Sequence, residues 1–241
     1  MVNAASDQER GPEHGSAVQA MFSRIASRYD LMNRLMTAGQ DAGWRERVVQ
    51  LARINPGNHI LDLGTGTGDL AFLIQKTEPH SRVIAVDFTV AMMQVGQTRP
   101  GGEQMAWSAG DSLRLPFSDE TFDAIVSGFL LRNVSSLDMA LAEHWRVLKP
   151  GGRWVSLDTT RPADNWLKPF VEIHLRYVIP GLGQLLTGDS SAYQYLPEST
   201  RNFLSAEDLA HRVSTAGFED VQFERKMFGT IAIHSARKSL A

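Results

Sequence analysis

Hydrophobic residues recur in two different rhythms along the chain, and the first of these rhythms is helical. From Val18 to Tyr29, apolar side chains return every three or four residues, which predicts an amphipathic helix. Further short helices are predicted through Leu35 and over 44–52. Residues 1–16 contain Gly and Pro and show no period, so we expect them to form a disordered tail.

After the turn at 55–57, the apolar residues gather into compact runs, which predict buried strands. These runs are HILDLG at 59–64, RVIAVD at 82–87, QMAWSAG at 104–110, FDAIVSG at 122–128 and GRWVSLDT at 152–159. Helices are predicted near 69–75, 90–97 and 137–148 and after Ser205, followed by alternating segments at 221–228 and 230–236. Because strands that alternate with helices pair in parallel, we expect an α/β, Rossmann-like fold with a mostly parallel seven-stranded sheet and helices on both faces.

One domain over 17–241 accommodates this order of elements, and no unit of 20–50 residues repeats itself. Its first part, 17–55, is expected to form an N-terminal helical cap. The stretch from Trp166 to Leu186 is apolar but is interrupted by Pro180 and two glycines, which predicts a kinked helical excursion. We therefore expect a lid insertion at about 163–200.

Composition and charge exclude several classes of protein. Hydrophobic residues make up 43% of the 241 residues and charged residues 21%, a mixture typical of globular proteins. The net charge of -3 gives no overall attraction to phosphate backbones, so no nucleic-acid partner is expected. Cysteine is absent and the seven histidines show no ligand spacing, so no metal site is expected. No apolar stretch approaches the ~20 residues that span a bilayer, and we expect a cytoplasmic protein.

The strongest local motif is a glycine-rich loop, DLGTGTGD at 62–69, which lies between a predicted strand and a predicted helix. Glycines at Gly64 and Gly66 let a ligand approach the backbone closely. A dinucleotide-binding fingerprint would need glycine where this chain has Asp69, and the Gly-Lys-Ser/Thr end of a phosphate-binding P-loop is missing. The loop therefore favours a ligand without phosphates, although a tight turn without any ligand remains an alternative.

Acidic residues follow the next two predicted strands. Asp87 ends the second strand, where a carboxylate can accept hydrogen bonds from both hydroxyls of a ribose. Asp111 and Ser112 follow the third strand and should lie across the same crevice, where Asp111 can receive an adenine amino group. Together with the glycine loop, they predict a pocket for S-adenosyl-L-methionine (SAM).

Several longer motifs resemble the class I SAM-dependent methyltransferases, and within them the ubiquinone/menaquinone biosynthesis C-methyltransferases. The resemblance covers roughly Phe22 to Lys238. It rests on FSRIASRYDLMN at 22–33, LDLGTGTGD at 61–69, LPFSDETFD at 115–123, LRNV at 131–134, RVLKPGG at 146–152 and YQYLPES at 193–199. The loop and RVLKPGG are shared by many methyltransferases, whereas IASRYDLMN, LRNV and YQYLPES are typical of the quinone-modifying branch.

The resemblance implies cofactor contacts at Thr67, Asp87, Asp111 with Ser112, and Gly128, beside the loop glycines Gly64 and Gly66. It also implies methyl transfer to a ring carbon of a reduced, prenylated benzoquinol or naphthoquinol, with demethylmenaquinol to menaquinol as the first expectation. Such a substrate lies in the membrane, so a peripheral contact with the inner face of the membrane is expected, and a homodimer is left open.

Four further residues are candidates for catalysis and substrate binding. Arg132 and Asn133 follow the fourth strand, where a guanidinium and an amide donor suit a developing phenolate, although a structural pair between arginine and a carboxylate is the alternative. Tyr29 in the cap and Tyr193 near the lid are expected to line the substrate site, although both could simply pack.

Two residues depart from the pattern of this family. Leu130 stands where the family usually has glycine, which adds a bulky wall and removes backbone freedom. Asp158 stands where the family usually has glutamate, and its side chain is one methylene shorter. These departures keep two alternatives open, namely a methyltransferase for a non-quinone small molecule and a catalytically silent SAM-binding scaffold subunit.

Overall fold

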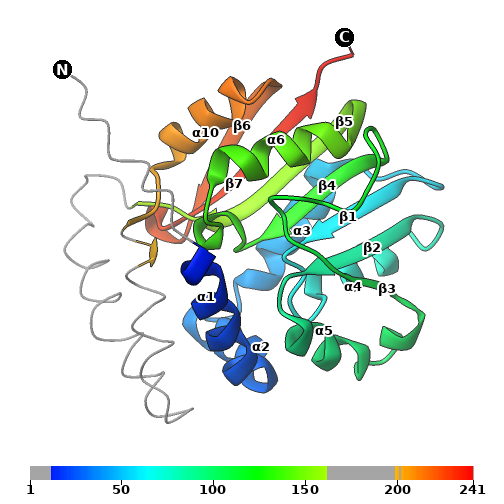
Figure 1. Ribbon diagram of the computed structural model, residues 1–241, viewed down its shortest axis with the longest axis vertical. Helices are drawn as coiled ribbons and strands as arrows, with labels where there is room; N and C mark the ends of the chain where they lie inside the picture. Colours follow the sequence, from blue (N-terminus) through cyan, green and yellow to red (C-terminus); the bar gives the residue numbers. More distant parts are fainter. Residues whose placement is uncertain (1–11, 162–198, 201, 241) are drawn as a thin grey trace.

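A single sheet in the order β3-β2-β1-β4-β5-β7-β6 organises the computed structural model, which describes residues 12–161, 199–200 and 202–240 (Figure 1). Its strands are β1 (His59–Leu63), β2 (Arg82–Asp87), β3 (Ala106–Ala109), β4 (Phe122–Gly128), β5 (Leu148–Thr159), β6 (Phe218–Lys226) and β7 (Ile231–Lys238). Among these described strands, only the two pairs that include β7 are antiparallel. The expected mostly parallel, seven-stranded α/β fold is confirmed.

The helices follow the predicted alternation. They are α1 (Pro12–Ile25), α2 (Tyr29–Met36), α3 (Asp41–Ala52), α4 (Asp69–Thr77), α5 (Val90–Gln97), α6 (Leu137–Val147) and α10 (Ala206–Thr215). The predicted start of the last helix is confirmed by its cap, because the Ser205 side chain accepts a hydrogen bond of 3.1 Å from the Asp208 amide.

The N-terminal region differs from its prediction in two ways. The first helix begins at Pro12, inside the expected disordered tail, and it ends at Ile25 rather than running on to Tyr29. A 3-10 turn over 26–28 separates α1 from α2. Met21 and Ile25 before the turn and Met32 after it are buried together in a small cluster of their own.

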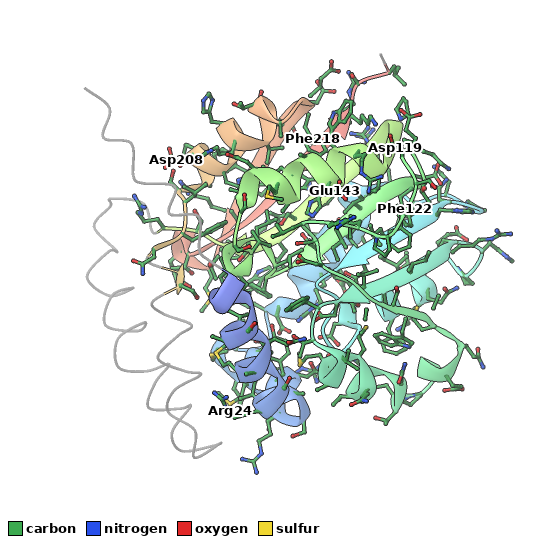
Figure 2. The ribbon with its side chains drawn as sticks, viewed as in Figure 1. Arg24, Asp119, Phe122, Glu143, Asp208 and Phe218 are labelled. Atoms are coloured by element: carbon green, nitrogen blue, oxygen red, sulfur yellow. The ribbon has the colours of Figure 1, made fainter. Side chains whose placement is uncertain are left out.

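Two apolar layers cover the sheet, one on each face. On one face, α3 and α4 bury Val48 and Ile74 against side chains of the inner strands. On the other face, α6 and α10 pack over the sheet, and Phe122 and Phe218 lie in this layer (Figure 2). Because both faces are covered, the inner strands are continuous hydrophobic runs.

The topology places the site. Since β1, β2, β3, β4 and β5 are parallel, their carboxyl ends meet at one edge of the sheet. The strand order reverses between β1 and β4, which is where open α/β sheets bind ligands. The lid expected at about 163–200 lies outside the described residues, except for Ser199 and Thr200, and Tyr193 lies outside them as well. None of the described helices has the length and apolar character that crossing a bilayer requires.

Candidate functional site

The glycine loop leaves β1 at the edge where the strand order reverses. Gly64 has a φ of +64°, and a Cβ there would lie 3.0 Å from the Cβ of Leu130. Gly68 precedes α4 with a φ of +91°, and a Cβ there would lie 2.6 Å from the Trp107 ring. A side chain at either position would therefore be strained and crowded, which explains why the loop requires glycine.

A cleft, which we call the main cavity, opens between this loop, α1, the end of β2 and the segments 110–113 and 128–135. The structure brings most of the predicted site residues together here. Those lining it are Tyr29, Gly64, Gly66, Asp87, Asp111, Ser112, Gly128 and Asn133.

Asp87 is held in one orientation at the end of β2. Its Oδ2 accepts a hydrogen bond of 2.7 Å from the Gly66 amide, and its Oδ1 accepts one of 2.7 Å from the Thr89 amide. Burial raises the pKa of this carboxyl above its usual value, while these backbone amides act in the opposite direction. Each carboxylate oxygen can accept a second hydrogen bond, so Asp87 is a fixed acceptor that faces the cavity.

The wall after β3 combines a turn with apolar packing. Asp111 is exposed, and its Oδ1 accepts a hydrogen bond of 2.9 Å from the Leu113 amide, while Ser112 is buried. Val86, Met92 and Leu113 supply apolar surface to the same cavity. A flat aromatic ring fits such a wall, with polar atoms at its rim.

Helix α1 lies across the main cavity, and sequence reasoning did not find this. Val18, Gln19 and Phe22 line the cavity, and the Gln19 side-chain amide donates a hydrogen bond of 2.7 Å to the Phe88 carbonyl. The helical period identified Val18 and Phe22 only as members of an apolar face. No sequence signal could tell that this face covers a cleft rather than a closed core.

A second hollow, the side cavity, also borders the glycine loop and shares Tyr29, Gly64, Gly66, Gly128 and Phe129 with the main cavity. Its remaining walls include Arg45 and Asp62, which sequence reasoning did not assign to the site, and Thr67, which was predicted. Thr67 Oγ1 donates a hydrogen bond of 2.6 Å to Asp30, so the predicted cofactor residue also ties the loop to α2.

Asp62 is a buried acid at the end of β1. Its Oδ2 accepts hydrogen bonds of 2.6 Å from Thr65 Oγ1 and 3.0 Å from the Ala71 amide. Burial, with the nearby carboxylates Asp87 and Asp69, raises its pKa from 3.8 to about 7, while its two donors act in the opposite direction. A positive charge in the side cavity would therefore stabilise the ionised form of Asp62.

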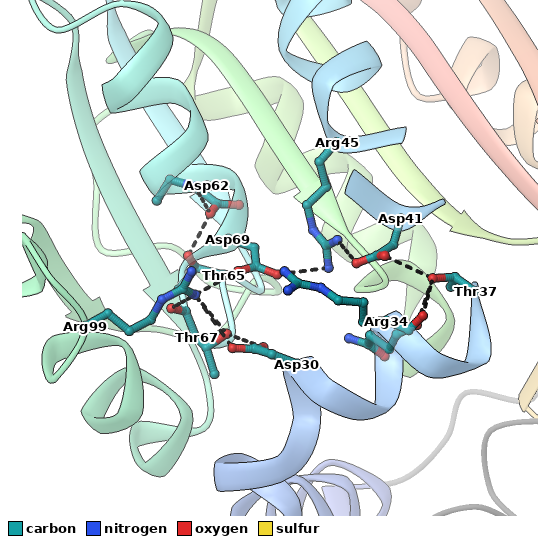
Figure 3. Close-up of polar contacts among 12 residues, drawn as sticks. Asp30, Arg34, Thr37, Asp41, Arg45, Asp62, Thr65, Thr67, Asp69 and Arg99 are labelled. Atoms are coloured by element: carbon teal, nitrogen blue, oxygen red, sulfur yellow. Dashed lines mark hydrogen bonds and ion pairs between the residues drawn. The ribbon is translucent and has the colours of Figure 1, made fainter. Parts of the chain in front are cut away.

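Charged residues join the N-terminal helices to this loop (Figure 3). Arg45 of α3 pairs with Asp41 on its own helix and, at 3.2 Å, with Asp69 at the start of α4. Arg99 pairs with Asp69 at 2.7 Å and with Asp30 of α2 at 3.7 Å. Arg45 thus lines the side cavity, and carboxylates from three helices hold Arg45 and Arg99 in place around the glycine loop.

The segment after β4 lines both cavities together with Tyr29. Phe129 has a left-handed φ of +62°, and the Asn133 side-chain amide donates a hydrogen bond of 2.9 Å to its carbonyl. Leu130 has ordinary helical angles, with a φ of -92° and a ψ of -52°. The expected loss of backbone freedom at Leu130 therefore has no consequence here, because the unusual conformation belongs to its neighbour.

Arg132 is buried in the same segment, with its side chain 4% exposed against Asp158, which is 1% exposed. The guanidinium Nη1 donates a hydrogen bond of 2.6 Å to Asp158 Oδ1, and its carbon lies 5.0 Å from the centre of the Phe129 ring. Arg132 lines neither the main nor the side cavity, whereas Asn133 lines the main one. This is the structural pairing that the sequence had left as the alternative.

Comparison with known proteins identifies relatives over nearly the whole chain. Residues 7–238 match the sequence model of the ubiE/COQ5 methyltransferase family. A "Ubiquinone/menaquinone biosynthesis C-methyltransferase UbiE" from Desulfotalea psychrophila is 48% identical, over 91% of this chain and 89% of that relative. A "Demethylmenaquinone methyltransferase" from Roseiflexus castenholzii is 41% identical, over 92% of this chain and 93% of that relative.

Solved structures agree at the level of the fold. The crystal structure of the [4+2]-cyclase SpnF superimposes with a TM-score of 0.68 and 17% sequence identity, over 93% of this chain and 96% of that chain. At such low sequence identity, this similarity supports the fold and gives no information about function.

Proposed function

The chain belongs to the ubiE/COQ5 methyltransferase family, and from this premise we propose that it transfers a methyl group from SAM to a ring carbon of a reduced, prenylated quinone. Demethylmenaquinol, which becomes menaquinol, is the first substrate that we propose, and the equivalent ubiquinone precursor is the second. The observation that carries this proposal is the continuity of the main cavity, which extends from Asp87 at the end of β2 to Phe129 and Asn133 after β4.

The residues of the main cavity fit SAM. The cofactor supplies an electrophilic methyl group on a sulfonium. Asp87 would accept the ribose hydroxyls, and Asp111 with Ser112 would border the adenine beside the apolar wall. Gly64, Gly66 and Gly128 leave room for the ligand along the backbone, and Thr67 holds the loop.

The acceptor ring would lie between Tyr29 and the segment after β4. A ring carbon becomes nucleophilic when a neighbouring phenol loses its proton, so donors that face the phenolate assist the reaction. Burial raises the pKa of Tyr29, which keeps its hydroxyl protonated and able to donate. The Phe22 ring packs edge-on against the Tyr29 ring, with 5.7 Å between the ring centres. This contact restricts how the Tyr29 ring can turn.

We assign different roles to the two residues proposed for catalysis. Asn133 lines the main cavity and can meet the acceptor, whereas Arg132 acts through its pair with Asp158 and positions the loop that carries Asn133. Arg132 is therefore a positioning residue in this proposal. Tyr193 stays in the proposal as a substrate-side residue.

A peripheral membrane contact is the part of the proposal that concerns the prenyl tail. Leu31 and Leu35 lie one turn apart on α2 and are 56% and 43% exposed, and the exposed Arg28 and Arg34 flank them. Leucines flanked by arginines suit the headgroup region of anionic bilayers. Flotation with anionic liposomes tests this contact, which should weaken in a Leu31→Ser, Leu35→Ser variant and stay unchanged with Leu240→Ser, at an exposed leucine near the end of the described chain.

The reaction is tested with purified protein, SAM and three acceptors: a short-tailed demethylmenaquinol, the corresponding benzoquinol and a soluble phenol. Mass spectrometry of the products should show one added methyl group on a ring carbon of a quinol. Methylation of the soluble phenol alone would favour the non-quinone alternative. Binding of SAM without turnover of any acceptor would favour the scaffold subunit.

A further inference from the structure

We propose that Asp30 is a positioning residue, which holds Tyr29 beside the glycine loop through its hydrogen bond with Thr67. The inference rests on the proposed methyl transfer and concerns a residue that lines neither the main nor the side cavity. Tyr29 begins α2 and Asp30 follows it directly, so a contact that fixes Asp30 also fixes the start of this helix. Through this contact, a residue of the acceptor side is connected to the loop that borders the cofactor.

The apolar packing of Tyr29 stays within the N-terminal helices. Its ring packs with the buried cluster of Met21, Ile25 and Met32. This cluster is separate from the two apolar layers that cover the sheet. Packing of this kind fixes Tyr29 relative to α1 and α2. Its place beside the glycine loop depends on contacts that cross from these helices to the loop.

The hydrogen bond between Asp30 and Thr67 is such a contact. Thr67 Oγ1 donates to Asp30 Oδ1 at 2.6 Å, and Thr67 is buried, so little water competes for its hydroxyl. A bond of this length from a hydroxyl to a carboxylate is roughly twice as strong as one between neutral groups. Thr67 lines the side cavity together with Tyr29. The bond therefore connects the start of α2 to a wall of the same cavity that Tyr29 lines.

Arg99 holds the loop end of this bond in place (Figure 3). Its Nη1 donates to the Thr67 carbonyl at 3.0 Å and pairs with Asp69 at 2.7 Å. The same Nη1 donates to Thr67 Oγ1 at 3.5 Å, which leaves the hydroxyl proton of Thr67 for Asp30. The guanidinium carbon of Arg99 also lies 4.7 Å from the centre of the Phe72 ring. The Thr67 hydroxyl is thus a donor with a fixed direction.

The experiment is a double-mutant cycle, measured with the quinol that the wild-type protein methylates fastest. In Asp30→Ala, kcat/KM for this quinol should fall about 10- to 100-fold, the loss expected when an aligned group moves by about 1 Å. Asp30→Asn should lose less, because its amide oxygen still accepts a hydrogen bond from Thr67. Adding Asp30→Ala to Tyr29→Phe should cause no further loss, because the hydroxyl that Asp30 positions is already absent.

Calorimetry with S-adenosylhomocysteine, the demethylated cofactor, shows whether Asp30→Ala damages the cofactor pocket. Its affinity should stay within about twofold, less than the loss of one hydrogen bond would produce. Asp138 of α6 provides a matched control, because it pairs with Arg212 at 2.7 Å and lines neither cavity. Asp138→Ala should leave both kcat/KM and the affinity unchanged.

Three results would overturn the inference. Additive losses in the Asp30→Ala, Tyr29→Phe variant would mean that Asp30 does not act through Tyr29. Equal losses of kcat/KM and of S-adenosylhomocysteine affinity in Asp30→Ala would mean that Asp30 only supports the fold. An unchanged kcat/KM in Asp30→Ala would mean that its hydrogen bond positions nothing that the reaction needs.

A second measurement separates this inference from the proposed function. In the ligand-free protein, hydrogen exchange followed by mass spectrometry should be faster across 29–36 in Asp30→Ala than in the wild type, and unchanged in β1 and β4. If the wild-type protein methylates no quinol, the proposed function fails, while hydrogen exchange still shows whether Asp30 holds α2. Equal exchange across 29–36 in the two proteins would overturn the inference even where the wild type methylates quinols.

Discussion

Arg132 and Asp158 form a buried ion pair 2.6 Å long that connects the segment after β4 to the end of β5. Asp158 also accepts a hydrogen bond of 3.3 Å from the Arg132 backbone amide, so one carboxylate binds both the side chain and the main chain of the same residue. The pair thereby holds the strained turn at Phe129, whose carbonyl Asn133 binds from the other side. The position of Asn133 in the main cavity depends on this arrangement.

Removing one partner of this pair should lower the stability of the folded protein. Asp158→Ala leaves a guanidinium buried without its carboxylate, and the free energy of unfolding should fall by about 3–5 kcal/mol in urea denaturation. The double variant Arg132→Met, Asp158→Leu should lose less than Asp158→Ala alone. A loss below about 1 kcal/mol in Asp158→Ala would show that the pair is effectively solvated.

The positioning role of Arg132 predicts a kinetic pattern. In Arg132→Lys, kcat should fall about 10- to 100-fold while the affinity for SAM stays the same, because the loop that carries Asn133 shifts and the nucleoside pocket does not. Steady-state kinetics with calorimetry measures both quantities. A large loss of SAM affinity with normal turnover of bound SAM would contradict this assignment.

Asp87 should contribute to binding through the nucleoside alone. Asp87→Ala should weaken the binding of S-adenosylhomocysteine and of methylthioadenosine by the same amount, roughly 1.5–3 kcal/mol, since both carry the ribose. Calorimetry with the two ligands measures this directly. An effect confined to S-adenosylhomocysteine would place Asp87 at the amino-acid end instead.

The pKa values of two buried groups predict opposing effects of pH on stability. Asp62 has a pKa raised from 3.8 to about 7 by burial, so the folded state binds its proton more tightly and this contribution to stability is lost as pH rises through that window. His144 has a pKa lowered by burial from 6.5 to about 4, so its contribution is lost as pH falls. In the wild-type protein, these two dependences of stability on pH therefore act in opposite directions.

Asp62→Asn should leave only the change of stability with pH that comes from His144. The new amide keeps an oxygen acceptor for Thr65 and Ala71 but does not titrate. The melting temperature of the ligand-free variant should rise more steeply between about pH 4 and 7 than that of the wild type. Parallel curves for the two proteins would show that Asp62 is ionised throughout this range.

Leu130 and Gly64 should behave as a packed pair. Gly64→Ala should reduce both stability and SAM affinity, because it combines a left-handed backbone with a methyl group placed 3.0 Å from Leu130. Adding Leu130→Ala should relieve the contact but not the backbone strain, so the rescue should be partial. Complete rescue would mean that the backbone at Gly64 adapts freely.

The sequence alone was sufficient for the parts of this protein that depend on local pattern. The alternation of strands and helices required a parallel sheet, and the carboxyl ends of parallel strands converge, so the order of the strands was enough to place Gly64, Asp87 and Ser112 in one cavity. The motifs around them pointed to the family. Each of these inferences needed only the order of residues along the chain and the geometry that a strand or a helix imposes.

Only the tertiary structure decided which side chains meet across distant segments. The period of the first helix marked an apolar face but could not say that Val18 and Phe22 cover a cleft. Arg45 carried no motif, and it reaches the side cavity because α3 packs beside the glycine loop. Arg132 follows β4 in the chain, yet its partner on β5 turns it into the core. Such pairs are set by the packing of whole elements, which the spacing of residues within one element does not encode.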